Sequence, residues 1–384
     1  MKRAAKTTTS ALKAEKTAKN EASDEVRNLQ DREDIKNYKT LNLKNGDKYQ
    51  ITRLLGEGVF GIVFECRSEK NEKIAAKVMK ETNEPPDTWK IELHILQQIA
   101  KHPHDNILHF LAVESINGPP AYCTENVIMT NALGPSLLDV ISTAEQRLRP
   151  DDYGCTFPVA QIGAIGKQLV AAMAHLDTVV KVYHLDLKPE NVYFVENGAF
   201  EIRRLATKHV CIEMRDVRVQ LGDFGCSKFH KDAESDVKPT MVQTQNYRAP
   251  EIFLGLPYSM KSDVWSFGAL MCEMYTGELL FFGTEQQPEA TQFEMMQRVV
   301  GQYCTRAMMR KALTIGSEKI RKQAGILQRT AKKFDLTRPL HMNIKRYDID
   351  AIPLFDMLRD VLIFDPDYRP SFSELQKHKF FMDI

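Results

Sequence analysis

Short runs that alternate apolar and polar residues, separated by glycine, predict strands near the start of the chain. YQITRLLG begins at Tyr49, VFGIVFECRS follows a glycine turn, and KIAAKVMK comes next. The stretch 87–100 instead repeats isoleucine every four residues, at Ile91, Ile95 and Ile99, which is the spacing of one helix face. ENVIMTNAL predicts another strand after this helix. We therefore expect a small, mostly β region with one main helix.

Beyond residue 135 the apolar spacing becomes helical. The main patterns are QIGAIGKQLVAAMAHLDTVV, DVWSFGALMCEMYTG, FEMMQRVVGQY, LFDMLRDVLIF and FSELQKHKFF. Residues 1–45 are polar and cannot bury enough apolar surface to offset their ordering entropy, so we expect a flexible charged tail. The whole pattern predicts an α+β fold of two lobes in one domain at 46–384. The β-rich lobe spans about 49–133 and the α-rich lobe about 134–382.

The composition adds a few exclusions to this picture. Lys+Arg 52 and Asp+Glu 51 almost balance over 384 residues, so there is no bulk attraction to nucleic acid or to a membrane surface. The seven cysteines contain no CxxC pair, which favours reduced thiols over a zinc site or a disulfide framework. No apolar run approaches the roughly 20 residues of a membrane-spanning helix, and the N-terminus lacks the apolar core of a secretory signal. We expect a soluble intracellular monomer, in the nucleus and/or the cytoplasm.

A glycine-rich motif joins the first two predicted strands. Glycines let a backbone approach a phosphate closely, with its N–H groups facing the anion. A dinucleotide-binding turn shares the GxGxxG spacing but opens a helix, whereas here the strand pattern IVFEC follows. The motif therefore indicates a phosphate-covering loop between strands, although an ordinary hairpin turn remains an alternative for this motif alone. Its residues are Gly56, Glu57, Gly58, Val59, Phe60, Gly61, Ile62 and Val63.

Lys77 follows Ala75 and Ala76 inside the next apolar strand. A lysine in that position is costly unless its ammonium group is paired. Glu92 of the predicted helix is the candidate partner. The alternative is a surface lysine and an unrelated glutamate on a helix face, and the neighbouring glycine motif weakens it.

Two motifs of the α-rich region carry oxygen and nitrogen side chains at fixed offsets. HLDLKPEN places Asp186, Lys188 and Asn191 after a histidine, and LGDFG places Asp223 after a strand pattern. The stretch between them, ENGAFEIRRLATKHVCIEMRDV, predicts an inserted hairpin. A third motif, APE, ends at Glu251.

In this order the motifs resemble the eukaryotic protein-kinase superfamily over residues 49–382. This resemblance implies that Arg369 of DPDYRPS is the ionic partner of Glu251. NYRAPEI is similar to the CMGC group. Within that group the chain most resembles the LAMMER kinases, which are dual-specificity kinases directed at SR proteins. Three features carry this likeness: a residue other than arginine at Leu185, the inserted hairpin, and TQFEMMQRVVG at 291–301, a degenerate form of the signature EHLAMMERILG.

The resemblance implies a fold, a reaction and a set of site residues. It implies ATP and Mg²⁺ as cofactors and transfer of the γ-phosphoryl group to Ser or Thr, and also to Tyr, of protein substrates. The implied catalytic residues are Asp186, Lys188, Lys77, Glu92 and Thr244, and the implied metal ligands are Asn191 and Asp223. The implied nucleotide-binding residues are Gly56, Glu57, Gly58, Val59, Phe60, Gly61, Val63, Ala75, Lys77, Thr130 and Tyr193.

Several positions depart from the usual kinase pattern. Leu185 replaces an arginine that receives a phosphate on the activation loop, so we predict activity without phosphorylation of that loop. Thr240→Ala should therefore be nearly silent, whereas Thr244 resembles the threonine that bonds the catalytic Asp and Lys. Tyr193 stands where an aliphatic residue usually packs beneath the adenine, which predicts an unusual nucleotide affinity. Thr130 is the expected gatekeeper, and its small side chain leaves room behind the adenine.

The substrate class stays open at this stage. The resemblance implies Arg/Ser-rich proteins, and neither nucleic acid nor membrane is expected as a direct partner. Residues 310–346, however, contain eleven Lys/Arg against two acidic residues, and a basic segment near the substrate would favour acidic peptides. A solvated face far from the substrate is the alternative. Two other activities also remain open: a pseudokinase that binds partners without turnover, and a kinase-fold enzyme that acts on small molecules.

Overall fold

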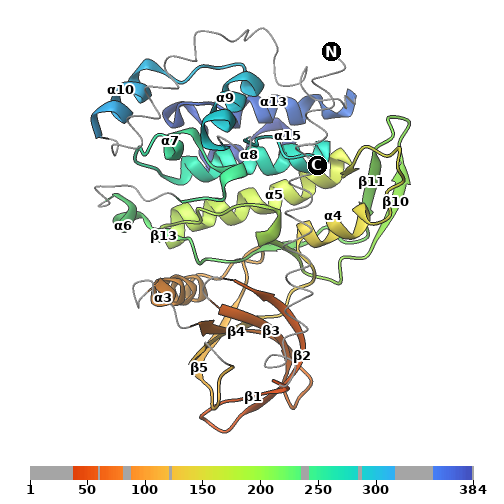
Figure 1. The fold of residues 1–384 in the computed structure, drawn as a ribbon, viewed down its shortest axis with the longest axis vertical. Helices are drawn as coiled ribbons and strands as arrows, with labels where there is room; N and C mark the ends of the chain where they lie inside the picture. The colour runs from red at the N-terminus through yellow and green to blue at the C-terminus, as the bar shows by residue number, and fades with distance from the viewer. Residues whose placement is uncertain are drawn as a thin grey trace. The chain divides into compact units, whose positions relative to one another are not determined.

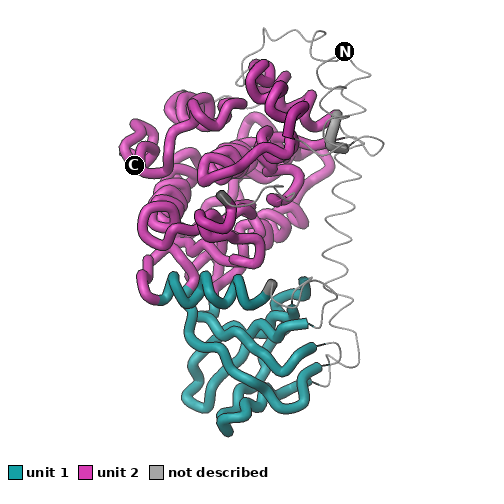
Figure 2. The backbone as a smooth tube through the Cα atoms, turned by 90° about the vertical axis from the view of Figure 1, so that its left-hand side faces the viewer, with its two compact units in different colours: residues 1–100, 109–132 teal, residues 101–108, 133–384 magenta. Residues whose placement is uncertain are grey.

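The computed structural model describes residues 38–58, 61–80, 88–120, 123–234, 242–283, 288–315 and 349–382. The chain divides into two compact units, shown in teal and magenta in Figure 2. Unit 1 comprises residues 1–100 and 109–132, and unit 2 comprises residues 101–108 and 133–384. Unit 1 is β-rich with one long helix, and unit 2 is mostly helical, so the predicted α+β fold with two lobes is confirmed.

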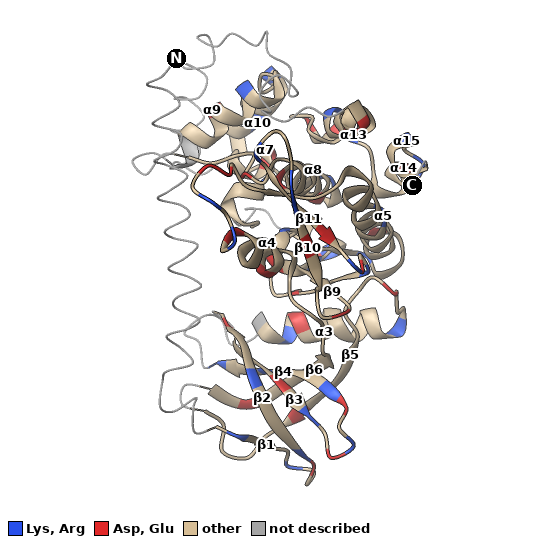
Figure 3. Ribbon diagram, turned by 90° about the vertical axis from the view of Figure 1, so that its right-hand side faces the viewer, with Lys and Arg blue, Asp and Glu red and all other residues tan. Residues whose placement is uncertain are grey.

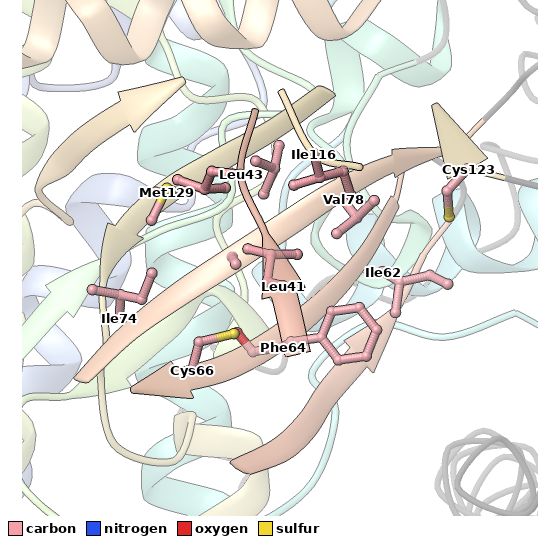
Figure 4. Packing of buried hydrophobic residues seen from close by; sticks show 12 residues of the cluster. Leu41, Leu43, Ile62, Phe64, Cys66, Ile74, Val78, Ile116, Cys123 and Met129 are labelled. Atoms are coloured by element: carbon pink, nitrogen blue, oxygen red, sulfur yellow. The ribbon is translucent and has the colours of Figure 1, made fainter. Parts of the chain in front are cut away.

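Unit 1 is built on a six-stranded antiparallel sheet in the order β1-β2-β3-β4-β6-β5. The strands are β1 (Thr40–Asn42), β2 (Lys48–Glu57), β3 (Gly61–Arg67), β4 (Lys73–Lys80), β5 (Phe110–Ser115) and β6 (Cys123–Asn131), and the helix is α3 (Thr88–Lys101). In β3 and β4 alternate residues are buried, as the period-two pattern predicts. Figure 4 shows the apolar cluster that they form, with Phe64 and Val78 among its members.

The segment before the glycine motif begins the sheet earlier than its composition predicts. Leu41 and Leu43 are buried in the apolar cluster, and Leu43 forms a β-bridge with Ile116 beyond the opposite edge strand. The backbone N–H of Lys44 also donates to the carbonyl of Ser115 at 2.8 Å. Residues 38–45 therefore belong to the folded unit and not to the predicted tail of residues 1–45. Residues 1–37 lie outside the described residues.

Unit 2 is organised around two long helices that lie side by side, α5 and α8 (Figure 1). Its α-helices are α4 (Leu137–Glu145), α5 (Val159–His175), α6 (His230–Glu234), α7 (Pro250–Phe253), α8 (Met260–Thr276), α9 (Pro288–Val300), α10 (Arg306–Ile315), α13 (Ile352–Val361), α14 (Phe372–Leu375) and α15 (Lys379–Met382). Helix α8 starts after Ser259, whose side chain accepts the N–H of Lys261, and ends at Gly277 with φ 72°. A side chain at Gly277 would collide with the carbonyl of Cys155, so only glycine fits this helix end.

The short strands of unit 2 confirm the inserted hairpin and frame the candidate site. Its strands are β7 (Cys155–Thr156), β8 (Val182–Tyr183), β9 (Val192–Phe194), β10 (Phe200–Arg204), β11 (Val210–Met214), β12 (Val219–Leu221) and β13 (Lys228–Phe229). Strands β10 and β11 pair antiparallel and form the hairpin expected between the HLDLKPEN and LGDFG motifs. The pairs β9–β12 and β8–β13 bring these two motifs together.

Short helical turns complete unit 2, and some boundaries differ from the sequence pattern. The turns are η1 (Leu176–Val180), η2 (Pro189–Asn191), η3 (Gln245–Tyr247), η5 (Ile349–Ala351) and η6 (Pro366–Tyr368). The pattern predicted for 161–180 divides into α5 and η1, a turn of π-helix. FSELQKHKFF forms two separate short helices, α14 and α15, and both bury their apolar residues in the core.

Candidate active site

Lys77 and Glu92 form the expected ion pair within unit 1. The Nζ of Lys77 on β4 lies 2.7 Å from both carboxylate oxygens of Glu92 on α3. Both side chains are largely shielded, with 19% and 6% of their surface exposed. A partly buried lysine needs such a partner, and the bidentate contact fixes the position of its ammonium group.

Strand register assembles the other candidate residues of unit 1 around this lysine. Val63 on β3 lies opposite Lys77, and Ala75 on β4 lies opposite Thr130 on β6. Gly61 begins β3 so close to β4 that a side chain carbon there would lie 2.6 Å from the carbonyl of Val78. This glycine is therefore required by packing. Val59 and Phe60 lie outside the described residues.

The glycine motif carries an ion pair that the sequence patterns missed. Lys80 at the end of β4 is bonded to the carboxylate of Glu57 at the end of β2, next to the glycine turn. The N–H of Gly58 donates to the carbonyl of Gly61 at 2.9 Å and closes that turn. The pair crosses β3 and joins two strands that are not neighbours, so the spacing of residues within a short stretch of sequence does not predict it.

In unit 2, the loop of HLDLKPEN is held by a buried carboxylate of helix α8. The backbone N–H groups of His184 and Leu185 donate to Asp263 at 3.0 and 2.8 Å. Leu185 has φ 61°, a conformation that branched residues rarely adopt, and these two bonds stabilise it. Complete burial raises the pKa of Asp263 to about 7, against the opposing effect of the N–H bonds.

His184 connects this loop to the LGDFG motif. It is completely buried, and burial lowers its pKa, which favours the neutral imidazole. Its Nε2 lies 3.1 Å from the carbonyl of Gly222, and its Nδ1 accepts the N–H of Asp186 at 3.2 Å. A neutral ring with the proton on Nε2 satisfies both contacts. Phe224 packs edge-on against the ring, with centroids 5.3 Å apart.

Asp186, Lys188 and Thr244 form one hydrogen-bonded network. Thr244 donates to Oδ1 of Asp186 through its backbone N–H at 3.0 Å and its hydroxyl at 2.7 Å. Lys188 donates to the hydroxyl of Thr244 at 2.9 Å and lies 2.8 Å from Oδ2 of Asp186. Burial raises the pKa of Asp186, but the ammonium of Lys188 and these hydrogen bonds outweigh it and hold the pKa below its usual range. Asp186 is therefore a carboxylate at neutral pH.

Asn191 and Asp223 offer oxygen atoms that fit a magnesium ion. The side-chain nitrogen of Asn191 donates to the carbonyl of Asp186 at 2.8 Å, which leaves its Oδ1 as the ligand atom. The N–H of Gly222 bonds the carbonyl of Asn191 at 2.9 Å, so Asp223 follows directly beside it. The carboxylate of Asp223 is exposed and accepts the N–H of Gly225. Magnesium prefers oxygen ligands and takes one or two from the protein, so this donor set fits.

Tyr193 lies on β9, directly after these residues, and its ring packs against Gly222. A side chain carbon at Gly222 would lie 3.0 Å from the ring. Burial raises the pKa of the Tyr193 phenol, so it stays neutral. The large side chain that replaces the expected aliphatic residue is therefore accommodated by a glycine and not by an open space.

The predicted pairing of Glu251 with Arg369 is present and fully buried. Arg369 donates to both carboxylate oxygens, at 2.8 and 2.7 Å, and neither side chain exposes more than 1% of its surface. Nearby, the hydroxyl of Tyr247 donates to Glu273 of α8 at 2.5 Å. These contacts anchor the segment after Thr244 to the helical core.

A family model described as Protein kinase domain matches residues 49–381. The chain belongs to the protein kinase family. A solved crystal structure of a kinase domain covers 89% of this chain and 97% of its own length, with a TM-score of 0.69 and 27% identity. The protein kinase fold expected from the motifs is thus confirmed.

The relatives of this kinase carry Ser/Thr and dual-specificity names. It is 30% identical to Dual specificity protein kinase lkh1 of Schizosaccharomyces pombe, over 91% of this chain and 49% of the relative. It is 29% identical to Serine/threonine-protein kinase AFC2 of Arabidopsis thaliana, over 87% and 77%, and 28% identical to mouse Dual specificity protein kinase CLK2, over 87% and 64%. The chain thus spans about half the length of lkh1. These relatives confirm the expected likeness to a divergent LAMMER-type kinase.

Each unit of the kinase holds its own group of the predicted residues. Unit 1 holds the glycine motif, Lys77, Glu92 and Thr130, and unit 2 holds the Asp186 network and Tyr193. Thr240 lies outside the described residues. Sequence patterns missed polar residues whose partners are distant in the chain, such as Lys80 and the buried Gln243, which bonds Ser262 and Ser266.

Proposed function

We propose that this kinase transfers the γ-phosphoryl group of Mg-ATP to Ser or Thr hydroxyls, and also to Tyr hydroxyls, of protein substrates. The observation that carries the proposal is the complete Asp186–Lys188–Thr244 network, with Asn191 bonded to its edge. Pseudokinases usually lack at least one of the groups that this chain retains, which argues against a protein that binds partners without turnover.

The chemistry assigns each side chain a step. The substrate oxygen attacks the γ-phosphorus, the bond to the bridging oxygen breaks, and ADP leaves. Asp186 orients the hydroxyl and accepts its proton; its pKa lies below the usual range, so the group is the ionised carboxylate that this role requires. Lys188 neutralises charge on the transferred group, and Lys77 binds the α- and β-phosphates. Asn191 and Asp223 would hold the magnesium ion, which would supply charge neutralisation to the phosphates of the nucleotide.

We infer further that phosphorylation of the activation loop is not required. Leu185 is completely buried and its backbone is held by Asp263, so no receptor for a loop phosphate exists at this position. Within the described residues the segment from Thr244 onward is held by contacts inside the protein: the N–H of Thr244 donates to Asp186, and the side chain of Arg248 donates to the carbonyl of Val242.

Two substrate classes are proposed for this kinase: Arg/Ser-rich proteins and acidic peptides. Family resemblance supports Arg/Ser-rich proteins. Helix α10 contains the first residues of the basic segment 310–346. It carries Arg306, Arg310 and Lys311 and no acidic residue, and Figure 3 shows its basic side in blue. Residues 316–348 lie outside the described residues. An acidic preference therefore stays an alternative that the assay decides.

The test is phosphate incorporation from labelled ATP with magnesium into two peptide pools, one Arg/Ser-rich and one acidic. We expect labelling of one pool by the wild type and loss of it in Asp186→Asn, and the preferred pool identifies the substrate class. Measurable ATP binding without labelling of peptide or of the protein itself would favour the pseudokinase. A panel of metabolites in the same assay tests the small-molecule alternative.

We also propose an intracellular monomer in the nucleus and/or the cytoplasm. All seven cysteines are free thiols, which suits a reducing compartment. None of the helices in the described ranges is long and apolar enough to cross a membrane. Sedimentation of the purified protein and fractionation of cells test both parts of this proposal.

A further inference from the structure

Gln292 is completely buried, yet only part of its amide is hydrogen-bonded. It lies on α9 within TQFEMMQRVVG, and its Nε2 donates to the carbonyl of Gln245 at 2.6 Å. Its Oε1 is buried and has no hydrogen-bond partner in the part of the chain that the structure describes. A buried acceptor without a partner opposes folding, so an apolar side chain would serve stability at least as well. The amide at this position therefore points to a role outside stability.

The side-chain hydrogen bond of Gln292 connects it to the catalytic network. Gln245 directly follows Thr244 and begins the turn η3. Thr244 bonds Oδ1 of Asp186 through both its N–H and its hydroxyl. Fixing the carbonyl of Gln245 therefore restricts the peptide plane between Gln245 and Asn246, one residue beyond Thr244. Asn246 adds a second tie to the same turn, because its side chain donates to the carbonyl of Phe281 at 3.1 Å.

We propose that Gln292 is a positioning residue for phosphoryl transfer. Through the carbonyl of Gln245 it holds Thr244 against the carboxylate of Asp186, in the orientation that the reaction needs. The inference rests on the proposed kinase activity and gives the LAMMER-like helix α9 a part in it. The same helix also supplies a natural contrast. Gln297 is buried too, but its Oε1 accepts the N–H of Cys304 at 3.0 Å, a contact outside the catalytic network.

The test compares the same substitution at these two glutamines in the full-length protein. Gln292→Leu should lower kcat about fivefold, the factor that corresponds to about 1 kcal/mol for one net hydrogen bond. The KM for Mg-ATP should stay unchanged, and the thermal midpoint should stay equal or rise. Gln297→Leu should lower the midpoint and leave kcat unchanged. Gln292→His keeps a ring N–H donor and should recover part of kcat.

A second measurement asks whether the effect passes through Thr244. Residues that act through one another give non-additive effects, so Gln292→Leu should cost no further activity in a Thr244→Ala background. A full fivefold loss in that background would overturn the inference, as would wild-type kcat in Gln292→Leu, or an equal kcat loss in Gln297→Leu. If the wild type labels peptides no better than Asp186→Asn, the proposed function fails and the inference fails with it. Wild-type labelling with an unaffected Gln292→Leu removes the inference alone.

Discussion

Replacing Arg369 with methionine tests how the segment after Thr244 is anchored. The guanidinium has five N–H donors, and all five are used. One donates to the carbonyl of Ile363, two to the carboxylate of Glu251, and one each to the carbonyls of Lys261 and Phe364. The side chain has no exposed surface. No other residue type reproduces this set of bonds.

The cost of the substitution follows from what stays behind. Glu251 remains buried and ionisable, and among the described residues the hydroxyl of Ser262, at 2.6 Å, is the side-chain donor left to its carboxylate. Breaking a buried ion pair by removing one partner costs about 3–5 kcal/mol, because the other charge is left without compensation. The three carbonyls that also lose a donor place Arg369→Met toward the upper end. Against a typical total stability of about 5–15 kcal/mol, this is a large fraction.

The assay is urea unfolding followed by circular dichroism, with Arg359→Met as the matched control. Arg359 pairs with Asp356 on the surface, where 71% and 51% of the two side chains are exposed, so its loss should cost about 0–1 kcal/mol. In Glu251→Gln/Arg369→Met the stranded charge is gone, and we expect a smaller loss than in Arg369→Met alone. Equal midpoints for Arg369→Met and Arg359→Met would refute the anchoring role. A double variant less stable than the single would refute the stranded charge as its cause.

Three further predictions concern the catalytic groups. Thr244→Ala should lower kcat about 10- to 100-fold, since a hydrogen bond to a charged group contributes about 1.5–3 kcal/mol, whereas Thr240→Ala should be nearly silent; peptide phosphorylation by the two variants side by side decides this. Asp186 should stay ionised between pH 8 and pH 5, because its pKa lies below the usual range. Protonation of Asp186 should therefore not lower the wild-type rate over this interval. Lys188→Met removes the largest effect that lowers this pKa, so the pKa should rise and the residual kcat/KM should fall more toward acid pH than it does in the wild type; identical profiles would contradict this. Lys80→Met removes the ion-pair partner of Glu57 in the glycine motif and should raise the KM for ATP more than it lowers kcat. An unchanged KM in steady-state kinetics would count against a role of this ion pair in ATP binding.

The fold was predictable wherever local period and motif spacing carry the information. Alternation placed β3 and β4, and fourfold spacing of isoleucines placed α3, to within a residue or two of their bounds. The strand β1 was missed because Leu41 and Leu43 are two apolar residues in a polar stretch, and composition averaged over 1–45 hides them. Their burial depends on Ile116, more than 70 residues later, so it is decided by the sheet and not by the segment.

The motif residues of the candidate site were predictable from the sequence, but the residues that hold them in place were not. The pairing of Lys77 with Glu92 follows from the cost of an unpaired lysine in an apolar strand, and the pairing of Glu251 with Arg369 follows from the resemblance to protein kinases. Gln292 gives no such signal. A glutamine on a helix reads as a surface residue, and only the packing of α9 against the turn η3 buries it. Supports of this kind join segments that are remote in the chain, and a pattern within a short window does not contain them.

The leucine at position 185 raises the question of what replaces a phosphate as the organiser of the activation segment. Leu185 occupies a strained backbone conformation, which costs on the order of 1–3 kcal/mol. The hydrogen bond from the N–H of Leu185 to the carboxylate of Asp263 compensates for this strain. Farther along, Gln243 also has a positive φ, of 67°, and its side chain bonds helix α8 while its carbonyl accepts from Arg248. Thr244 then reaches Asp186 directly. All of these contacts form within the folded chain, without an added charge. These contacts support the proposal that packing against the core of unit 2, and not phosphorylation of the activation loop, completes the catalytic geometry.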